Sequence, residues 1–410
     1  MKKILSVFLC MLIVLSCVFV SVLADGEELY AIDEEYYAKF KGQNIKLYVY
    51  NWGEYIADGA DGSRDVIAWF EELTGIDVEY TTFDTNEGLY SKLQSGSAYY
   101  DIVIPSDYMV SRLAQQGMLE KLNFDNIPNF AKYVDETFHS PGYDSAQEYS
   151  VPYTWGTVGI IYNTKYIDSV DSWEALWNEE YKGKILMFDN SRDAFAIALK
   201  RLGYSLNTEN TEEITEAAEL LKEQKPLVQA YVMDQIFDKM VEENAWIAPY
   251  YAGDYLTMAE DNEALAFAFP KEGTNSFTDA MCIPKGSVNK EAAELFINFM
   301  CEPAVSAENC GMIGYSTPIS AAKDLMDEEI VSNEIAYPDA DILANTEMFV
   351  NLSDDANRQL DILWISVSVG SLTPGFWLVV SVASVLILVS AIHHMTVKKK
   401  RAAMRAAKDN

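Results

Sequence analysis

The sequence predicts an α/β protein of two lobes, joined by a hinge around a central cleft, with a transmembrane helix at its C-terminal end. Three observations lead to this prediction. Strand-like and helix-like patterns alternate along most of the chain, as they do when helices cover both faces of an open sheet. Two segments, 151–161 and 267–283, are expected to cross between a first α/β unit and a second, and then back to the first. The uncharged segment 375–393 then precedes a basic tail.

Length and composition are consistent with two cores. A chain of 410 residues, 50% hydrophobic and 12% aromatic, can bury two domain-sized interiors. The formal charge of −33 argues against nucleic acid as a partner. The globular middle is more acidic still, because basic residues cluster at the two ends of the chain. Such a surface attracts cations or keeps the protein soluble, and composition does not separate these two interpretations.

The first half of the globular region predicts lobe 1, residues 45–150. Its strand and helix patterns alternate regularly, and a ligand in such a sheet binds beyond the carboxyl ends of the strands. The loops 52–54 and 106–108 occupy that position. The strands are expected at 44–50, 76–82 and 100–104, and the helices at 63–73, 86–93 and 109–116.

A second unit, lobe 2, is predicted for residues 151–266, and residues 267–363 are expected to return to lobe 1 and to end in helices. The two crossings between the lobes form the hinge, so the cleft can close on a small ligand. The second unit is expected to have strands at 184–188, 245–250 and 265–269 and helices at 194–202, 212–223 and 231–243, and the return a helix at 290–300.

The two ends of the chain predict one topology. Residues 1–24 have the basic start, apolar middle and small-residue end of a signal peptide, although an uncleaved N-terminal anchor and lipidation of Cys17 stay open. Residues 375–393 are expected to span a membrane, and the basic tail 394–410 then lies in the cytoplasm. The globular region is therefore expected outside the cytoplasm, tethered by its C-terminal helix.

The segment from Asn275 to Pro284 contains the chemistry of a cation site. Phe277 and Asp279 are two residues apart, so in a strand they point to the same face. An aromatic surface beside a carboxylate is what an organic cation requires. The simpler interpretation is a half-buried strand with a surface Asp.

Five motifs, in order along residues 45–361, resemble those of the spermidine/putrescine-binding proteins of polyamine ABC transporters. The resemblance implies a two-lobed, type II periplasmic-binding-protein-like fold without a cofactor. It also implies a polyamine ligand and, as partners, ABC permease subunits with a cytoplasmic ATPase. The motifs are Tyr-Asn-Trp-Gly-Glu-Tyr at 50–55, Ile-Pro-Ser-Asp-Tyr at 104–108, Pro-Tyr-Thr-Trp-Gly-Thr at 152–157, Phe-Pro-Lys-Glu-Gly at 269–273 and Gly-Tyr-Ser-Thr-Pro at 314–318.

Carried over position by position, the resemblance implies an aromatic-walled cleft with spaced carboxylates, among which Asp279 is the principal one. Tyr251 stands where a Trp is usual. Asn190 and Phe349 replace polar partners of the spermidine-preferring proteins, which favours a shorter diamine such as putrescine. The ligand-binding residues implied are Trp52, Glu54, Ser106, Tyr108, Asn190, Asp193, Tyr251, Asp254, Phe277, Asp279, Tyr315 and Phe349.

Three alternative functions can be compared with the sequence. An enzyme is disfavoured because the sequence has no nucleophile elbow, metal-ligand cluster or phosphate loop. A ferric-ion-binding transport protein of similar fold would use the adjacent Tyr250 and Tyr251, with His139 as the one His of the outer region. A tethered polyamine sensor without transport is the third. Pairing of Cys301 with Cys310 stays open.

Overall fold

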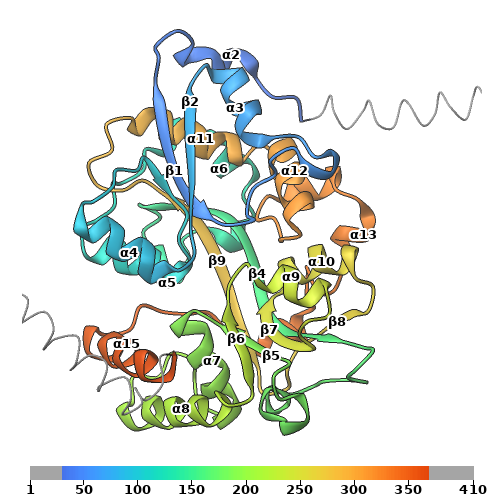
Figure 1. The fold of residues 1–410 in the computed structure, drawn as a ribbon. Helices are drawn as coiled ribbons and strands as arrows, with labels where there is room; N and C mark the ends of the chain where they lie inside the picture. Colours follow the sequence, from blue (N-terminus) through green and yellow to red (C-terminus); the bar gives the residue numbers. More distant parts are fainter. Residues whose placement is uncertain (1–29, 369–410) are drawn as a thin grey trace, which may run out of the picture. The chain divides into compact units, whose positions relative to one another are not determined.

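The computed structural model describes residues 30–368 (Figure 1). The chain divides into two compact units, residues 1–360 and 361–410, and the fold below is that of the first. One run of hydrogen-bonded strands passes through it in the order β2-β1-β3-β9-β4-β7-β5-β6, with β10 beside β9 and β8 beside β4. The strands are β1 (Lys46–Trp52), β2 (Asp77–Phe83), β3 (Ile102–Val103), β4 (Ser150–Asn163), β5 (Ile185–Phe188), β6 (Val228–Val232), β7 (Ile247–Tyr251), β8 (Leu265–Ala268), β9 (Thr274–Cys282) and β10 (Thr346–Glu347).

Strands β4 and β9 connect the two lobes, as Figure 1 shows. They pair antiparallel from Ser150↔Cys282 to Thr157↔Ser276, with a register shift between Pro152 and Thr154. Beyond this pairing β4 continues into the second lobe, where β7 and β8 take up its edges. Nearly every residue of both strands is buried, including the polar Thr274, Asn275, Thr278 and Asp279 of β9.

Lobe 1 is built on the parallel strands β2, β1 and β3, followed by the antiparallel β9. Its helices use ordinary capping chemistry. Asp65 accepts a hydrogen bond from the N–H of Ala68 at the start of α3, and Gly75 ends that helix with φ +69°. The helices of this lobe are α2 (Glu34–Tyr37), α3 (Val66–Thr74), α4 (Asn86–Ser95), α5 (Asp107–Gln115), α6 (Pro128–Tyr133), α11 (Lys290–Met300), α12 (Pro303–Ile313) and α13 (Glu328–Val331).

Lobe 2 contains the parallel strands β6, β5 and β7. Here one expectation is wrong: residues 228–232 form β6, and the predicted helix 231–243 is reduced to α9 (Ile236–Val241). Tyr231 and Val232 pair with Met187 and Phe188 of β5, and this ladder outweighs local helical patterning. The other helices of this lobe are α7 (Ser191–Leu202), α8 (Thr211–Gln224) and α10 (Ala252–Asp261). Two further helices, α14 (Ala340–Ala344) and α15 (Asp354–Ser368), follow later in the chain, and residues 361–368 of α15 belong to the second unit.

The expected C-terminal transmembrane helix requires a correction. Across residues 30–368 the structure has no helix that is both long enough and apolar enough to cross a bilayer. The two-lobed α/β fold is supported, and the added transmembrane helix is not. The predicted segment 375–393 lies outside the described residues, as do the signal segment 1–24 and the tail 394–410.

The three cysteines in the described part of the chain, Cys282, Cys301 and Cys310, are buried and free. The pairing of Cys301 with Cys310 that the sequence left open is absent. Burial raises the pKa of the Cys310 thiol to about 12, so it stays protonated at neutral pH.

Candidate functional site

A pocket lies where the strands of the two lobes present their carboxyl ends. It encloses about 610 Å³ not filled by protein atoms, including solvent at its mouth. All twelve residues implied by the motif resemblance line it. They come from the ends of β1 and β7 and the segments after them, from the segments that follow β3, β5 and β10, from β9 itself, and from the turn after α12.

Asp279 is the most enclosed carboxylate at the β9 side of the pocket, with 4% of its surface exposed. Its Oδ2 accepts a hydrogen bond of 2.6 Å from the Tyr55 hydroxyl, which also contacts Thr154 Oγ1. Its Oδ1 is buried and has no hydrogen-bond partner among the described residues. Burial raises the pKa of Asp279 to about 6, although the hydroxyls of Ser106 and Tyr55 lower it. Oδ1 is thus available to a donor entering the pocket.

Aromatic rings form a connected wall around this carboxylate. Phe277 makes edge contacts with Tyr251 at 5.4 Å and with Tyr315 at 6.3 Å between ring centroids. Tyr315 in turn packs edge-on against Tyr55 at 4.6 Å. Trp52 packs against Phe83, and the Trp52 Nε1 donor is buried without a hydrogen-bond partner. A cation with an apolar body would find rings along its length and polar groups at its ends.

Asp193 and Asp254 are the buried carboxylates from lobe 2. The Tyr251 hydroxyl donates to Asp193 Oδ2 at 3.0 Å. Burial raises the pKa of Asp193 to about 7 and raises that of Asp254 well above its usual value. The negative charges of Asp234, Glu54 and Asp279 add to the rise at Asp254. A cation placed beside either carboxylate would therefore stabilise its ionised form.

The end of the pocket near Phe349 has a different character. Asn190 Oδ1 accepts from the N–H of Arg192 at 3.0 Å and so caps helix α7. The buried Arg192 guanidinium lies 4.6 Å from the Phe349 ring and 4.9 Å from the Tyr108 ring. The Tyr108 hydroxyl donates to Glu87 Oε1 at 2.9 Å. This end therefore presents an apolar ring backed by a positive charge.

Several lining residues were missed by the sequence reasoning. Tyr55 lay inside a quoted motif, but only the structure reveals its contact with Asp279. Asn86 holds Ser106 through two hydrogen bonds of 3.1 Å, one to the backbone and one to the hydroxyl. Asp234 follows β6, the strand that the sequence reasoning assigned to a helix. The missed residues are Gly53, Tyr55, Asn86, Met233, Asp234, Phe237, Tyr250 and Asn275.

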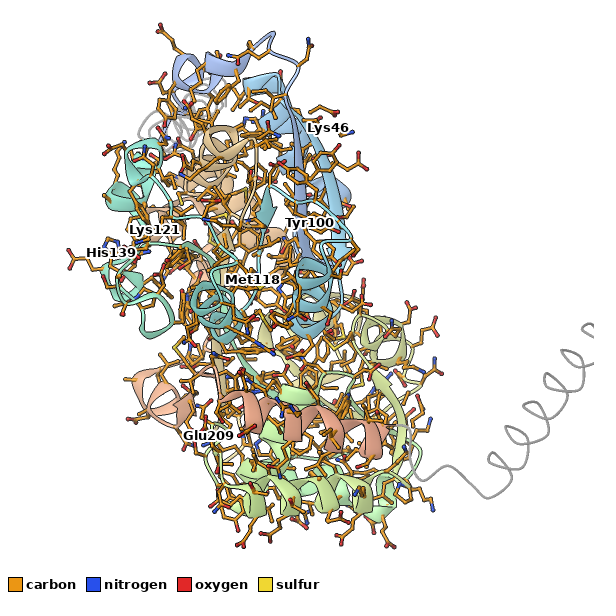
Figure 2. All side chains as sticks on the ribbon, turned by 90° about the vertical axis from the view of Figure 1, so that its left-hand side faces the viewer. Lys46, Tyr100, Met118, Lys121, His139 and Glu209 are labelled. Carbon is orange, nitrogen blue, oxygen red and sulfur yellow. The ribbon has the colours of Figure 1, made fainter. Side chains whose placement is uncertain are left out.

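The charged side chains that line the pocket are all acidic. Five carboxylates line the pocket, and within residues 30–368 no Lys, Arg or His does. His139, which a ferric-ion-binding protein would need as a ligand, does not line the pocket. Its ring stacks on Phe130, and Figure 2 labels it at the periphery of lobe 1. The second supposed iron ligand, Tyr251, is hydrogen-bonded to Asp193. The lining therefore suits an organic cation, and the fold and pocket together define a solute-binding protein.

Comparison with known proteins places the chain in a family. Residues 65–338 match the family described as "Bacterial extracellular solute-binding protein". The spermidine/putrescine-binding periplasmic protein of Salmonella typhimurium is 35% identical over 77% of this chain and 90% of its own length. The putrescine-binding periplasmic protein SpuD of Pseudomonas aeruginosa is 30% identical over 80% of this chain and 93% of its own length.

Solved structures agree with these relatives. A putative spermidine/putrescine ABC transporter from Listeria monocytogenes superposes with a TM-score of 0.75 at 38% identity, covering 78% of this chain and 98% of that one. The substrate-binding protein PotD of a spermidine/putrescine ABC transporter of Streptococcus pneumoniae gives 0.66 at 34% identity, covering 79% and 98%. The chain belongs to the bacterial extracellular solute-binding proteins, and the resemblance stated from its motifs is confirmed. Members of this family bind solutes and are not enzymes.

Proposed function

We propose that this protein is the extracytoplasmic substrate-binding component of a polyamine ABC importer. It binds a linear diamine or triamine between its lobes and delivers it to the permease subunits, which a cytoplasmic ATPase drives. The observation that carries the proposal is the composition of the pocket lining. Among the described residues, five carboxylates and a continuous aromatic wall line the pocket, and no basic side chain does. The printed names of the relatives, spermidine/putrescine-binding and putrescine-binding, support the same substrate class.

The twelve residues named from the motifs are proposed as the ligand contacts. Asp279 receives one ammonium, because its Oδ1 is buried and takes part in no hydrogen bond. A primary ammonium has three donors and stays charged at neutral pH, so a second carboxylate must receive the other end. Asp193, Asp254 and Glu54 are the candidates from the remaining sides of the pocket. The methylene chain then lies against Phe277, Trp52 and the neighbouring rings.

A shorter ligand suits the Phe349 end. Asn190 is committed to capping α7, and Phe349 offers no acceptor. The Arg192 guanidinium behind the ring disfavours a third ammonium there. We therefore place putrescine ahead of spermidine as the preferred ligand.

The test is calorimetric titration of the protein with putrescine, cadaverine, spermidine and spermine. We expect micromolar or tighter binding of at least one, with putrescine strongest. Asp279→Asn keeps the shape of the side chain but removes its charge, and should weaken binding by at least about 100-fold, since a buried charged hydrogen bond is lost together with the ion pair. Asp238→Asn, an exposed carboxylate of α9 outside the pocket, is the matched control.

Two results would contradict the proposal. Absence of binding to all four amines would show that the ligand is not a polyamine of this class. Unchanged affinity in Asp279→Asn would mean that the ligand does not use this pocket. Transport is tested separately, by uptake of labelled putrescine in cells that lack the gene for this protein and in cells that carry it.

A further inference from the structure

Asp234 is the one carboxylate of the pocket that no motif pointed to. It lies between β6 and α9 of lobe 2, two residues after the end of the strand. Its carboxylate packs against Gly53, which follows β1 of lobe 1. A Cβ placed on Gly53 would overlap Asp234 Oδ2 and lie 3.1 Å from Asp234 Cγ. The two lobes thus meet at this point, and glycine is what permits so close an approach.

Glu54 comes from the opposite lobe at the same contact. Its backbone has φ +48°, a left-handed conformation that is unfavourable for a residue with a side chain. The carbonyl of the next residue, Tyr55, accepts a hydrogen bond of 2.5 Å from the Tyr153 hydroxyl, which keeps the turn in place. Glu54 and Asp234 line the same pocket from the two lobes, and the backbone of Glu54 is constrained.

The electrostatics of this contact are repulsive without a ligand. Burial raises the pKa of Asp234, and the negative charges of Asp84 and Glu54 raise it further. Asp84 follows β2 and belongs to lobe 1. The described residues place no Lys or Arg in an ion pair with Asp234, Glu54 or Asp84. Bringing the lobes together therefore brings like charges together across the gap.

We propose that Asp234 is a specificity-determining residue, which together with Glu54 allows the lobes to close fully only on a ligand that brings a positive charge to this end of the pocket. Asp279 holds the first ammonium, and the second ammonium relieves the repulsion between Asp234 and Glu54. A monoamine of the same length fills the apolar part of the pocket but leaves the two carboxylates opposed. The inference rests on the proposed function and adds to it the discrimination of diamines from monoamines.

The experiment compares putrescine with n-butylamine, which has the same four carbons and one ammonium. Calorimetry on the wild type should favour putrescine by at least about 100-fold, since one desolvated charge contact is missing from the monoamine. In Asp234→Asn this ratio should fall by about tenfold or more. Putrescine binds less tightly because it loses a partner, and n-butylamine binds more tightly because the closed lobes no longer repel.

Asp238→Asn is the matched control, because it removes the same charge from the same lobe four residues further on, at an exposed site outside the pocket. Its ratio should equal that of the wild type. Small-angle X-ray scattering on the ligand-free proteins gives a second readout. Asp234→Asn should be more compact than the wild type because closure without ligand becomes easier. Glu54→Gln, which removes the other half of the repulsive pair, should lower the ratio as well.

The inference would be overturned if Asp234→Asn melted normally and kept a ratio of putrescine to n-butylamine affinity within twofold of the wild-type ratio. If Asp234→Asn does not fold, the Glu54→Gln ratio decides in the same way. Failure of the proposed function looks different, since the wild type itself would then bind no diamine.

Discussion

Tyr55 donates a 2.6 Å hydrogen bond to Asp279 Oδ2 inside the protein, joining a loop of lobe 1 to the strand that connects the lobes. Both groups are almost fully enclosed, and the tyrosine ring also packs against Tyr315. The bond holds the carboxylate in one orientation and stabilises its anionic form. One carboxylate oxygen is thereby occupied, and the other is left for a ligand.

Tyr55→Phe should weaken putrescine binding at pH 7 by about tenfold, because one hydrogen bond to a charged group is lost. Without the hydroxyl the pKa of Asp279 rises above its present value of about 6, so more of the carboxyl is protonated at neutral pH. Calorimetry at pH 7 and pH 9 checks this, and the deficit should shrink at pH 9. A deficit that is equal at both pH values would show that the hydroxyl acts through packing alone.

Stability of the ligand-free protein should fall as pH rises from 5 to 8. Burial raises the pKa of Asp279 to about 6, of Asp193 to about 7 and of Asp107 to about 8, from 3.8 in each case. The folded state therefore binds more protons than the unfolded state, so these groups favour folding most at low pH and lose that contribution as pH passes through their folded pKa values.

Polyamine binding has the opposite dependence. The ammonium pairs with ionised carboxylates, so affinity should rise with pH over the same interval, and binding at pH 6 to 7 should release protons. Thermal melts with and without putrescine test both statements, together with calorimetry in buffers of different ionisation enthalpy. A putrescine-induced rise in Tm that is constant from pH 5 to 8 would contradict the coupling.

Gly253→Ala should weaken ligand binding and lower Tm. Gly253 lies at the start of α10 in lobe 2, and an added Cβ would lie 2.6 Å from Tyr315 Cε2. The methyl group forces the pocket-lining ring to move or the lobes to separate, and overpacking of this kind costs about 1–3 kcal/mol. Gly142→Ala is the control, because nothing lies within 4 Å of its added Cβ. Equal effects of the two changes on affinity would exclude a steric role for Gly253.

Phe349→Gln should shift selectivity towards spermidine. The ring is 5% exposed and separates the pocket from the Arg192 guanidinium, whose Nη1 is buried without a partner. A Gln carbonyl can accept from an ammonium in the pocket, and it can shield the ligand from the arginine. The ratio of spermidine to putrescine affinity should rise about tenfold, the size expected of one added hydrogen bond to a charged group. An unchanged ratio measured by calorimetry would place the length determinant elsewhere.

Much of the fold followed from local patterns. The β4 crossing was visible because a strand that is buried on both faces is rich in apolar residues, whereas β9 carries several buried polar residues and was indicated by its apolar end and its motif context. The helix 290–300 matches α11 at both ends, since Asn289 and Cys301 bound a clear amphipathic pattern. β6 was misread because Tyr231 and Val232 also fit the helical spacing of the residues that follow. Asp234 was missed for that reason: a strand that is not recognised cannot indicate the loop at its carboxyl end.

The two-lobed α/β architecture, the acidic character and the polar and aromatic segments at the strand ends could be predicted from the residues alone. These properties depend on residues that are close together along the chain, so periodicity and composition reveal them. Only the tertiary structure decided how the segments meet. The Tyr55 bond to Asp279, the Arg192 charge behind Phe349 and the contact of Asp234 with Gly53 each join residues at least 150 positions apart. Such contacts arise from packing and charge between whole elements, and no local pattern records them.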